Sequence, residues 1–351
     1  VVTGSKPERA APLLSLLDAQ KIPYAVFPVS GEPSVADARR GTAQAREVSC
    51  DFVIGIGGGA VLDTGKAIAA LLTNPGDPLD YLEVIGKGKA IQNPAAPYIA
   101  IPTTAGTGAE VTSNAVLASP EHQVKVSLRS PLMLARLALV DSELTHSCPP
   151  DVTAYSGLDA LTQVIEPFVS TKANPITDRL SYEGIWTARW ALRRSYEQGD
   201  DAEAREAMSL VSLLGGLALS NAKLGAVHGF AGPFGGLFDA PHGGICARLL
   251  PCVMETNIHA LRERQPNSKY LNIYDTIARI LTADDSATAD DGVRFVQNLC
   301  NDMQIPPLSS YGLTPSDFPS LIEKSAAASS MQGNPIKLTT DEMYHLLAAA
   351  L

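Results

Sequence analysis

The chain has 351 residues, more than one ordinary hydrophobic core organises, and this length favours two domains. Hydrophobic residues make up 45% and charged residues 18%, which supports packed globular domains and excludes a disordered chain. The net charge of -10 gives no overall attraction to nucleic acid or anionic lipid, so we expect neither nucleic acid nor a membrane as a partner.

The cysteine content indicates a reducing environment. There are five cysteines and none stands in a Cys-x-x-Cys pair, so neither a disulfide framework nor a structural zinc site is expected. We therefore expect a cytoplasmic location. The chain opens at Val1 in a strand-like segment, from which we expect further residues upstream.

In the first 150 residues, short β-type runs alternate with helical stretches. Predicted strands end at Thr3 and cover 24–29, 51–56, 98–101 and 138–140, while predicted helices cover 9–20, 36–48 and 63–72. This alternation predicts a parallel sheet with helices on both faces.

Beyond Pro149-Pro150 the pattern becomes helical. Predicted helices cover 152–170, 175–196, 202–222, 270–281, 290–303, 315–328 and 340–351, with Asp151, Asp290 and Thr340 as expected N-caps. The predicted fold class is an α/β nucleotide-binding domain over residues 1–150, followed by an all-α domain over residues 151–351.

Two polar turns follow predicted strands. Gly57-Gly58-Gly59 opens a helix, where glycines let the backbone approach a phosphate and the helix amides point at the anion. The pattern is neither Gly-x-Gly-x-x-Gly nor a P-loop, and a tight turn without a ligand is the alternative. The segment 102–112 offers Thr hydroxyls and amides to ribose and phosphate oxygens, or else forms a polar loop that caps a helix.

Two further segments carry possible metal ligands. Asp159 and Gln163 are four residues apart, so both lie on one helix face and can share a cation. Taken alone, this pair is more typical of a solvated helix face. On one straight helix His228 and His242 would lie roughly 21 Å apart, too far for one metal. Because proline and glycine fill the segment between them, we expect a loop that brings both imidazoles to one point.

These motifs together, in this order, resemble the iron-containing (group III) alcohol dehydrogenase family, with dehydroquinate synthase as a relative on the same scaffold. The resemblance runs from Val1 to about Pro251 and returns weakly at Asn334-Pro335 and the last helix. It implies hydride transfer between NAD(H) or NADP(H) and a small aldehyde, ketone or alcohol, assisted by Fe²⁺ or Zn²⁺. It also implies a homodimer.

The resemblance further implies the site residues. The pyrophosphate would lie on Gly57, Gly58, Gly59 and Ala60, and other cofactor contacts would come from Gly4, Ser5, Asp63, Thr103, Thr104, Thr107 and Lys125. The metal would be held by Asp159, His228 and His242, with Gln163 where the family usually has a fourth, histidine ligand.

Two departures from the family keep alternatives open. Gln163 is a weaker donor than imidazole, and Gly232 stands where the family often has a proton-relaying histidine. The alternatives are a metal-independent enzyme similar to maleylacetate reductases, a non-redox enzyme similar to dehydroquinate synthase, and a nucleotide-binding protein without turnover. Phe230, Phe234 and Phe238 either line the substrate pocket or pack the core.

The end of the first strand bears on the choice of cofactor. The family's NAD-selecting acidic residue is replaced by Gly4, and Ser5 and Lys6 follow it. A carboxylate would repel a 2′-phosphate, whereas a hydroxyl and an ammonium group attract one. We therefore predict a preference for NADPH, with acceptance of both cofactors as the alternative.

Overall fold

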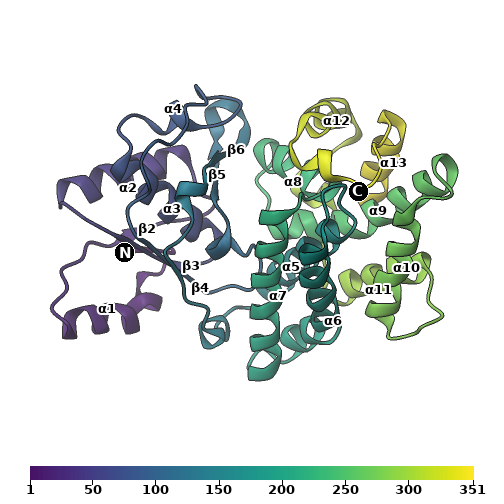
Figure 1. The fold of residues 1–351 in the computed structure, drawn as a ribbon, viewed down its shortest axis with the longest axis horizontal. Helices are drawn as coiled ribbons and strands as arrows, with labels where there is room; N and C mark the ends of the chain where they lie inside the picture. Colours follow the sequence, from purple (N-terminus) through teal and green to yellow (C-terminus); the bar gives the residue numbers. More distant parts are fainter. The chain divides into compact units, whose positions relative to one another are not determined.

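The computed structural model describes all residues, Val1–Leu351. The chain divides into two compact units, residues 1–104 with 109–144 and residues 105–108 with 145–351. The first unit is an α/β fold and the second is almost entirely helical, in agreement with the predicted fold class (Figure 1).

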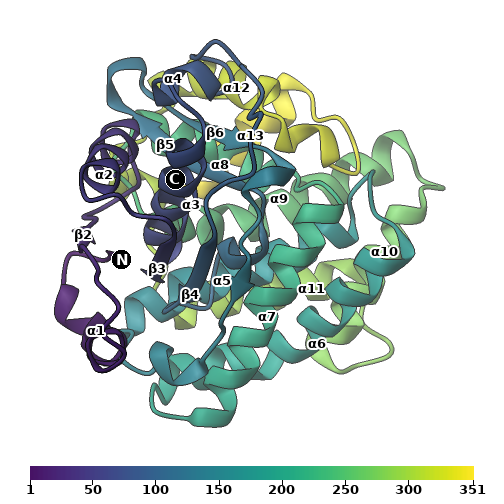
Figure 2. The same ribbon diagram turned by 60° about the vertical axis from the view of Figure 1, so that its left-hand side comes forward.

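The first unit contains a parallel sheet of five strands in the order β2-β1-β3-β4-β7. The strands are β1 (Val2–Thr3), β2 (Phe27–Pro28), β3 (Val53–Gly57), β4 (Tyr98–Pro102) and β7 (Leu137–Ala138). Gly57 pairs with Pro102, and Thr3 pairs with Ile56. The segments that leave β1, β3 and β4 therefore begin at the same edge of the sheet. Figure 2 shows β3 and β4 next to each other, with α3 alongside.

Helices cover both faces of this sheet, as the strand–helix alternation predicts. They are α1 (Ala11–Ala19), α2 (Val35–Glu47) and α3 (Gly59–Thr73), while the short α4 (Pro78–Tyr81) packs against α2. Val53 packs in one core with Leu62 of α3, while its neighbour Ile54 packs in another with Leu17 of α1. Successive strand residues point to opposite faces, so a strand buried on both sides is apolar throughout.

The first unit also has elements that periodicity did not predict. An antiparallel hairpin is formed by β5 (Asn114–Ser119) and β6 (Val124–Arg129). Short 3-10 turns lie at Pro7–Ala10, Ala109–Val111, Pro120–His122, Pro131–Met133 and Ser142–Thr145. Helix α3 begins four residues earlier than predicted because the glycine-rich turn itself forms the first helical turn.

The second unit is built around α5 (Pro150–Phe168), which packs against α6 (Pro175–Glu197), α7 (Ala202–Asn221) and α9 (His242–Arg264). The remaining helices are α8 (Ala226–Leu237), α10 (Lys269–Thr282), α11 (Ala289–Asp302), α12 (Phe318–Ala327) and α13 (Thr340–Ala350), with 3-10 turns at Leu308–Tyr311, Pro315–Asp317 and Ser330–Gly333. No single helix is long and apolar enough to cross a membrane. Helices α7 and α8 reach the necessary length and apolar composition only when taken together, and they are bent by 96° relative to each other.

The three expected N-caps are wrong by one to two residues. The caps of α5, α11 and α13 are Pro149, Thr288 and Thr339, and the Thr339 side chain accepts a hydrogen bond from the Glu342 amide. Asp151 and Asp290 lie in the first turns instead. The macrodipole favours carboxylates there as well, so the composition of a helix start does not locate the cap to one residue.

The segment between His228 and His242 is not the predicted loop. Helix α8 continues through Pro233 to Leu237, the chain turns over residues 238–241, and α9 begins at His242. Phe230 and Phe234 are fully buried in the core of the second unit. This packing stabilises a helix that proline and glycine disfavour locally. Of the two roles expected for Phe230 and Phe234, pocket lining or core packing, the structure shows core packing.

Candidate metal centre

Asp159 lies near the middle of α5, and its side chain is only 2% exposed. Its Oδ1 atom is buried and accepts no hydrogen bond of good geometry. Two imidazole nitrogens lie nearby, His228 Nε2 at 3.4 Å and His242 Nε2 at 3.9 Å. A buried carboxylate oxygen without a hydrogen bond is costly, so its position beside two imidazole nitrogens indicates a site for a cation.

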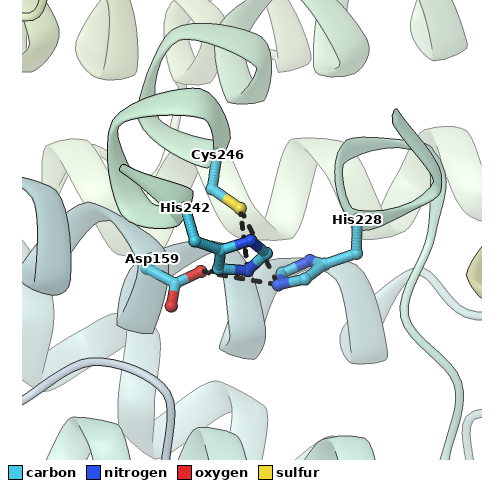
Figure 3. Close-up of side chains that lie close together, drawn as sticks. All are labelled: Asp159, His228, His242 and Cys246. Carbon is cyan, nitrogen blue, oxygen red and sulfur yellow. Dashed lines mark hydrogen bonds and ion pairs between the residues drawn. The ribbon is translucent and has the colours of Figure 1, made fainter. Parts of the chain in front are cut away.

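The two histidines come from different helices. His228 lies in the first turn of α8, and His242 is the first residue of α9. Their ring centroids are 5.5 Å apart, and both rings face Asp159 (Figure 3). The convergence of the imidazoles is therefore confirmed, although two helices joined by a turn produce it rather than a loop.

A fourth side chain, Cys246, faces the same point (Figure 3). Its Sγ atom lies 3.6 Å from His242 Nε2 and 3.9 Å from His228 Nε2. One oxygen, two nitrogens and one sulfur from these four residues all lie within 4.8 Å of one another. The sequence analysis did not single out Cys246. The available signal was its spacing of four residues from His242, which acquires meaning once a helix begins at His242.

Glu166 supports the site from behind. Its Oε2 lies 2.6 Å from His228 Nδ1, and its Oε1 accepts a hydrogen bond of 2.7 Å from the Val227 amide. A carboxylate at this position keeps a proton on Nδ1, which leaves Nε2 as the ring nitrogen that would bind a metal. The sequence analysis also missed this residue, which stands seven positions after Asp159 and so lies on the same face of α5.

Gln163 lies one turn after Asp159, but its amide is turned toward other partners. The Nε2 atom donates to the Gly106 carbonyl at 2.9 Å and to Asp159 Oδ2 at 3.3 Å. Because a carbonyl oxygen only accepts hydrogen bonds, the nitrogen must face Gly106. Gln163 thus orients the carboxylate as a donor, and this geometry lends no support to coordination through its oxygen.

The surroundings of His228 and His242 favour the positively charged form of both imidazoles. Burial disfavours a charged imidazole, yet the contacts of His242 with Cys246 and Asp159 outweigh burial and raise the pKa of His242 to about 9. Burial is likewise overcome at His228, whose pKa lies well above its usual value because of Cys246 and Glu166. At Asp159, burial raises the pKa, but His228 and His242 lower the pKa by a larger amount, so the pKa of Asp159 lies below its usual value. These carboxylate, imidazole and thiol donors suit a divalent transition metal.

The expected phosphate site has the necessary backbone arrangement. Gly58 precedes α3 and provides no side-chain cap, so the first amides of this 15-residue helix are available to an anion. The Thr103 amide donates to the Gly57 carbonyl at 3.0 Å. A Cβ built on Gly58 would lie 3.4 Å from Thr104 Oγ1. Gly57, Gly58, Ala60, Thr103 and Thr104 therefore belong to neighbouring turns at one edge of the sheet.

The other cofactor candidates are more scattered. Asp63 has protein partners at both oxygens, with Lys66 Nζ at 3.0 Å and the Val116 amide at 2.9 Å. Lys125 lies in β6, and its ammonium group pairs with Glu32 at 3.2 Å. Gly4 and Ser5 follow β1 at the edge described above, while Thr107 belongs to the second unit.

Comparisons with known proteins cover almost the whole chain. Residues 1–142 match the sequence profile of "Iron-containing alcohol dehydrogenase", and residues 153–351 match that of "Fe-containing alcohol dehydrogenase family, C-terminal". The 1,3-propanediol dehydrogenase of Klebsiella pneumoniae is 35% identical over 324 residues, which are 92% of this chain and 82% of that protein.

Two solved structures have the same fold throughout. A 1,3-propanediol oxidoreductase superposes with a TM-score of 0.88 at 31% identity and covers 100% of this chain and 91% of its own. Sulfoacetaldehyde reductase from Bifidobacterium kashiwanohense, in complex with NAD⁺, superposes with a TM-score of 0.86 at 28% identity. The superposition covers 99% of this chain and 89% of the reductase chain. The chain belongs to the iron-containing alcohol dehydrogenase family and is an oxidoreductase that transfers hydride between nicotinamide and a small alcohol or carbonyl compound with the help of a divalent metal.

Proposed function

We propose that this enzyme prefers NADPH and that Asp159, His228 and His242 hold its catalytic metal. The observation that carries the metal assignment is Asp159 Oδ1, a buried oxygen without a hydrogen bond that lies 3.4 Å and 3.9 Å from two imidazole nitrogens. Asp159 and Glu166 are buried carboxylates beside the two histidines, so a divalent cation would relieve the cost of burying these groups.

When bound, the metal supplies Lewis-acid polarisation of the substrate oxygen. The chain's own residues prepare the site. Glu166 holds the Nδ1 proton of His228, so that Nε2 is free to bind. Gln163 donates to Asp159 Oδ2 and leaves Oδ1 toward the histidines. Together these contacts hold the donor atoms in position before metal or substrate arrives.

The proposed cofactor site combines the sheet edge with the start of α3. The uncapped amides of α3 would bind the pyrophosphate, with Gly57, Gly58, Gly59, Ala60, Thr103 and Thr104 around it. No carboxylate stands at Gly4, and the exposed Lys6 follows two residues later. A 2′-phosphate would therefore meet a hydroxyl and a positive charge. The other proposed contacts are Thr107 and Lys125, and we also propose a homodimer, which light scattering would test.

The test measures hydride transfer with NADPH and NADH against a panel of small aldehydes, ketones and alcohols, with metal-stripped and metal-restored enzyme. We expect activity that disappears with the metal and returns with it, and tighter binding of NADPH than NADH in fluorescence titrations. Full activity of metal-free enzyme would contradict the metal proposal and favour the route similar to maleylacetate reductases. Absence of nicotinamide turnover would contradict the function itself.

The variant Asp159→Asn keeps the side-chain shape while it removes the negative charge that both imidazoles face. We expect loss of metal binding and of activity. As a matched control, Asp151→Asn changes an exposed aspartate in the first turn of the same helix and should leave both unchanged.

A further inference from the structure

The buried cysteines of the second unit fall into two groups. Cys252 donates its thiol to the Arg248 carbonyl, and Cys300 donates to the Ala247 carbonyl. Cys246 is fully buried as well, but its thiol contacts two imidazole nitrogens and the Asp159 carboxylate rather than a backbone carbonyl. Packing explains the first two thiols, whereas Cys246 stands among candidate metal ligands.

Four of the distances between donor atoms are close to those of a tetrahedral site. With bonds of about 2.0–2.3 Å to oxygen, nitrogen and sulfur, tetrahedral coordination separates nitrogen from oxygen by about 3.4 Å and nitrogen from sulfur by about 3.6 Å. The corresponding distances here are 3.4 Å and 3.9 Å from Asp159 to the two histidines, and 3.9 Å and 3.6 Å from Cys246 to them. One ion can therefore reach all four atoms with small side-chain adjustments.

Local structure explains why the cysteine arrives at this point. His242 and Cys246 are four residues apart in the first turns of α9, so their side chains lie on one face. A Cβ built on Gly243 would lie 2.4 Å from the Tyr155 carbonyl oxygen of α5. The start of α9 therefore approaches the α5 backbone closely, and this brings both side chains to Asp159.

We propose that Cys246 is the fourth protein ligand of the metal and that the resulting Asp–His–His–Cys set makes zinc the preferred ion over iron. This inference rests on the proposed metal-dependent function. It replaces Gln163, whose amide nitrogen faces Gly106 and Asp159, with a ligand from another helix. A thiolate is a soft donor that favours zinc. A given set of protein ligands also generally binds Zn²⁺ more tightly than Fe²⁺.

Cobalt substitution tests the proposal directly, because a thiolate bound to Co²⁺ produces a charge-transfer absorption in the near ultraviolet. We expect this band in metal-stripped wild-type protein reconstituted with Co²⁺, its loss in Cys246→Ser, and its retention in Cys252→Ser. Cys252 is the matched control because it is buried on the same helix and bonds a backbone carbonyl. Burial also raises the pKa of its thiol to about 11, so it remains a thiol.

Affinity measurements provide the second readout. Competition with a chromophoric chelator should show that Cys246→Ser binds Zn²⁺ at least about tenfold more weakly, since loss of an outer partner alone costs that much. The ratio of Zn²⁺ affinity to Fe²⁺ affinity should also be smaller in Cys246→Ser than in the wild type. Cys252→Ser should have the wild-type affinities for both ions. The wild-type cobalt spectrum keeps the proposal testable even if Cys246→Ser fails to fold, because absence of the charge-transfer band excludes a thiolate ligand.

The outcomes separate this inference from the proposed function. If wild-type protein binds Co²⁺ without the charge-transfer band, and hydride transfer still requires metal, Cys246 is not a ligand although the function stands. If Zn²⁺ affinity and selectivity are unchanged in Cys246→Ser, the inference is also overturned. Hydride transfer by enzyme that binds no metal would overturn the metal-dependent function together with the ligand assignment.

Discussion

Replacement of Glu166 by glutamine is the most informative change at the edge of the metal centre. The Glu166 side chain is 4% exposed and has two partners, the Val227 amide at 2.7 Å and His228 Nδ1 at 2.6 Å. Both partners act as donors when His228 has its Nε2 lone pair free. A carboxylate accepts from both, whereas a carboxamide has only one accepting atom.

Glu166→Gln must therefore leave one mismatch. If its oxygen accepts from Val227, its NH₂ group faces Nδ1 and stabilises the tautomer with the proton on Nε2, which cannot bind a metal. If the amide is reversed, NH₂ meets the Val227 amide at the start of α8. The first arrangement avoids a contact between two donors and is preferred, and in it His228 can bind a metal only without its hydrogen bond to a charged group, worth about 1.5–3 kcal/mol. At about 1.4 kcal/mol per decade, metal affinity should fall roughly tenfold to a hundredfold.

The assay is chelator competition for Zn²⁺ or Co²⁺ with wild type, Glu166→Gln and Glu255→Gln, at a pH where the histidines bind metal. Glu255 is an exposed glutamate on α9, so Glu255→Gln controls for the change in charge and should behave as wild type. Circular dichroism establishes that the variants are folded. A folded Glu166→Gln protein with wild-type metal affinity would refute the argument that Glu166 selects the tautomer of His228.

Three further predictions concern the cofactor, the first unit and the metal. Gly4→Asp should reverse the predicted preference and weaken NADPH relative to NADH by roughly tenfold to a hundredfold, as a 2′-phosphate would then meet a carboxylate; fluorescence titration measures both dissociation constants, and an unchanged ratio would contradict it. Lys66→Met should destabilise the protein by about 3–5 kcal/mol in denaturant unfolding, because the fully buried ammonium pairs with Asp63 and bonds Thr112, whereas Lys87→Met at an exposed ion pair should change little. Adding Zn²⁺ to metal-stripped protein at a hundred times its dissociation constant should stabilise it by about 2.7 kcal/mol, and an unchanged melting temperature in Asp159→Asn would show that the gain comes from this site.

Much of the fold could be predicted from local pattern. The predicted strand 51–56 is apolar after Asp51 and the strand 98–101 is apolar throughout, and the structure has β3 from Val53 and β4 from Tyr98 because a strand buried on both faces needs no polar residue. Helices α6 and α7 begin where Asn174 and Asp201 cap them. The hairpin of β5 and β6 escaped detection because its neighbouring turn residues resemble those of any loop.

The helices α8 and α9 could not be predicted by the same means. Pro233, the glycines around it and Pro251 disfavour a helix locally, and only burial of residues such as Phe230 and Phe234 overcomes that cost. Such burial depends on neighbours far away in the chain, which no short window of sequence contains.

The candidate site divides in the same way. Asp159, His228 and His242 stand out in the sequence because their residue types and motifs are typical of a metal site. Cys246 and Glu166 are recognisable only in the folded chain, since their roles depend on where α9 approaches α5 and where α8 begins. The sequence by itself determined which donors are present, but the packing of three helices decided which atoms meet, because coordination depends on distances between residues that the chain separates by tens of positions.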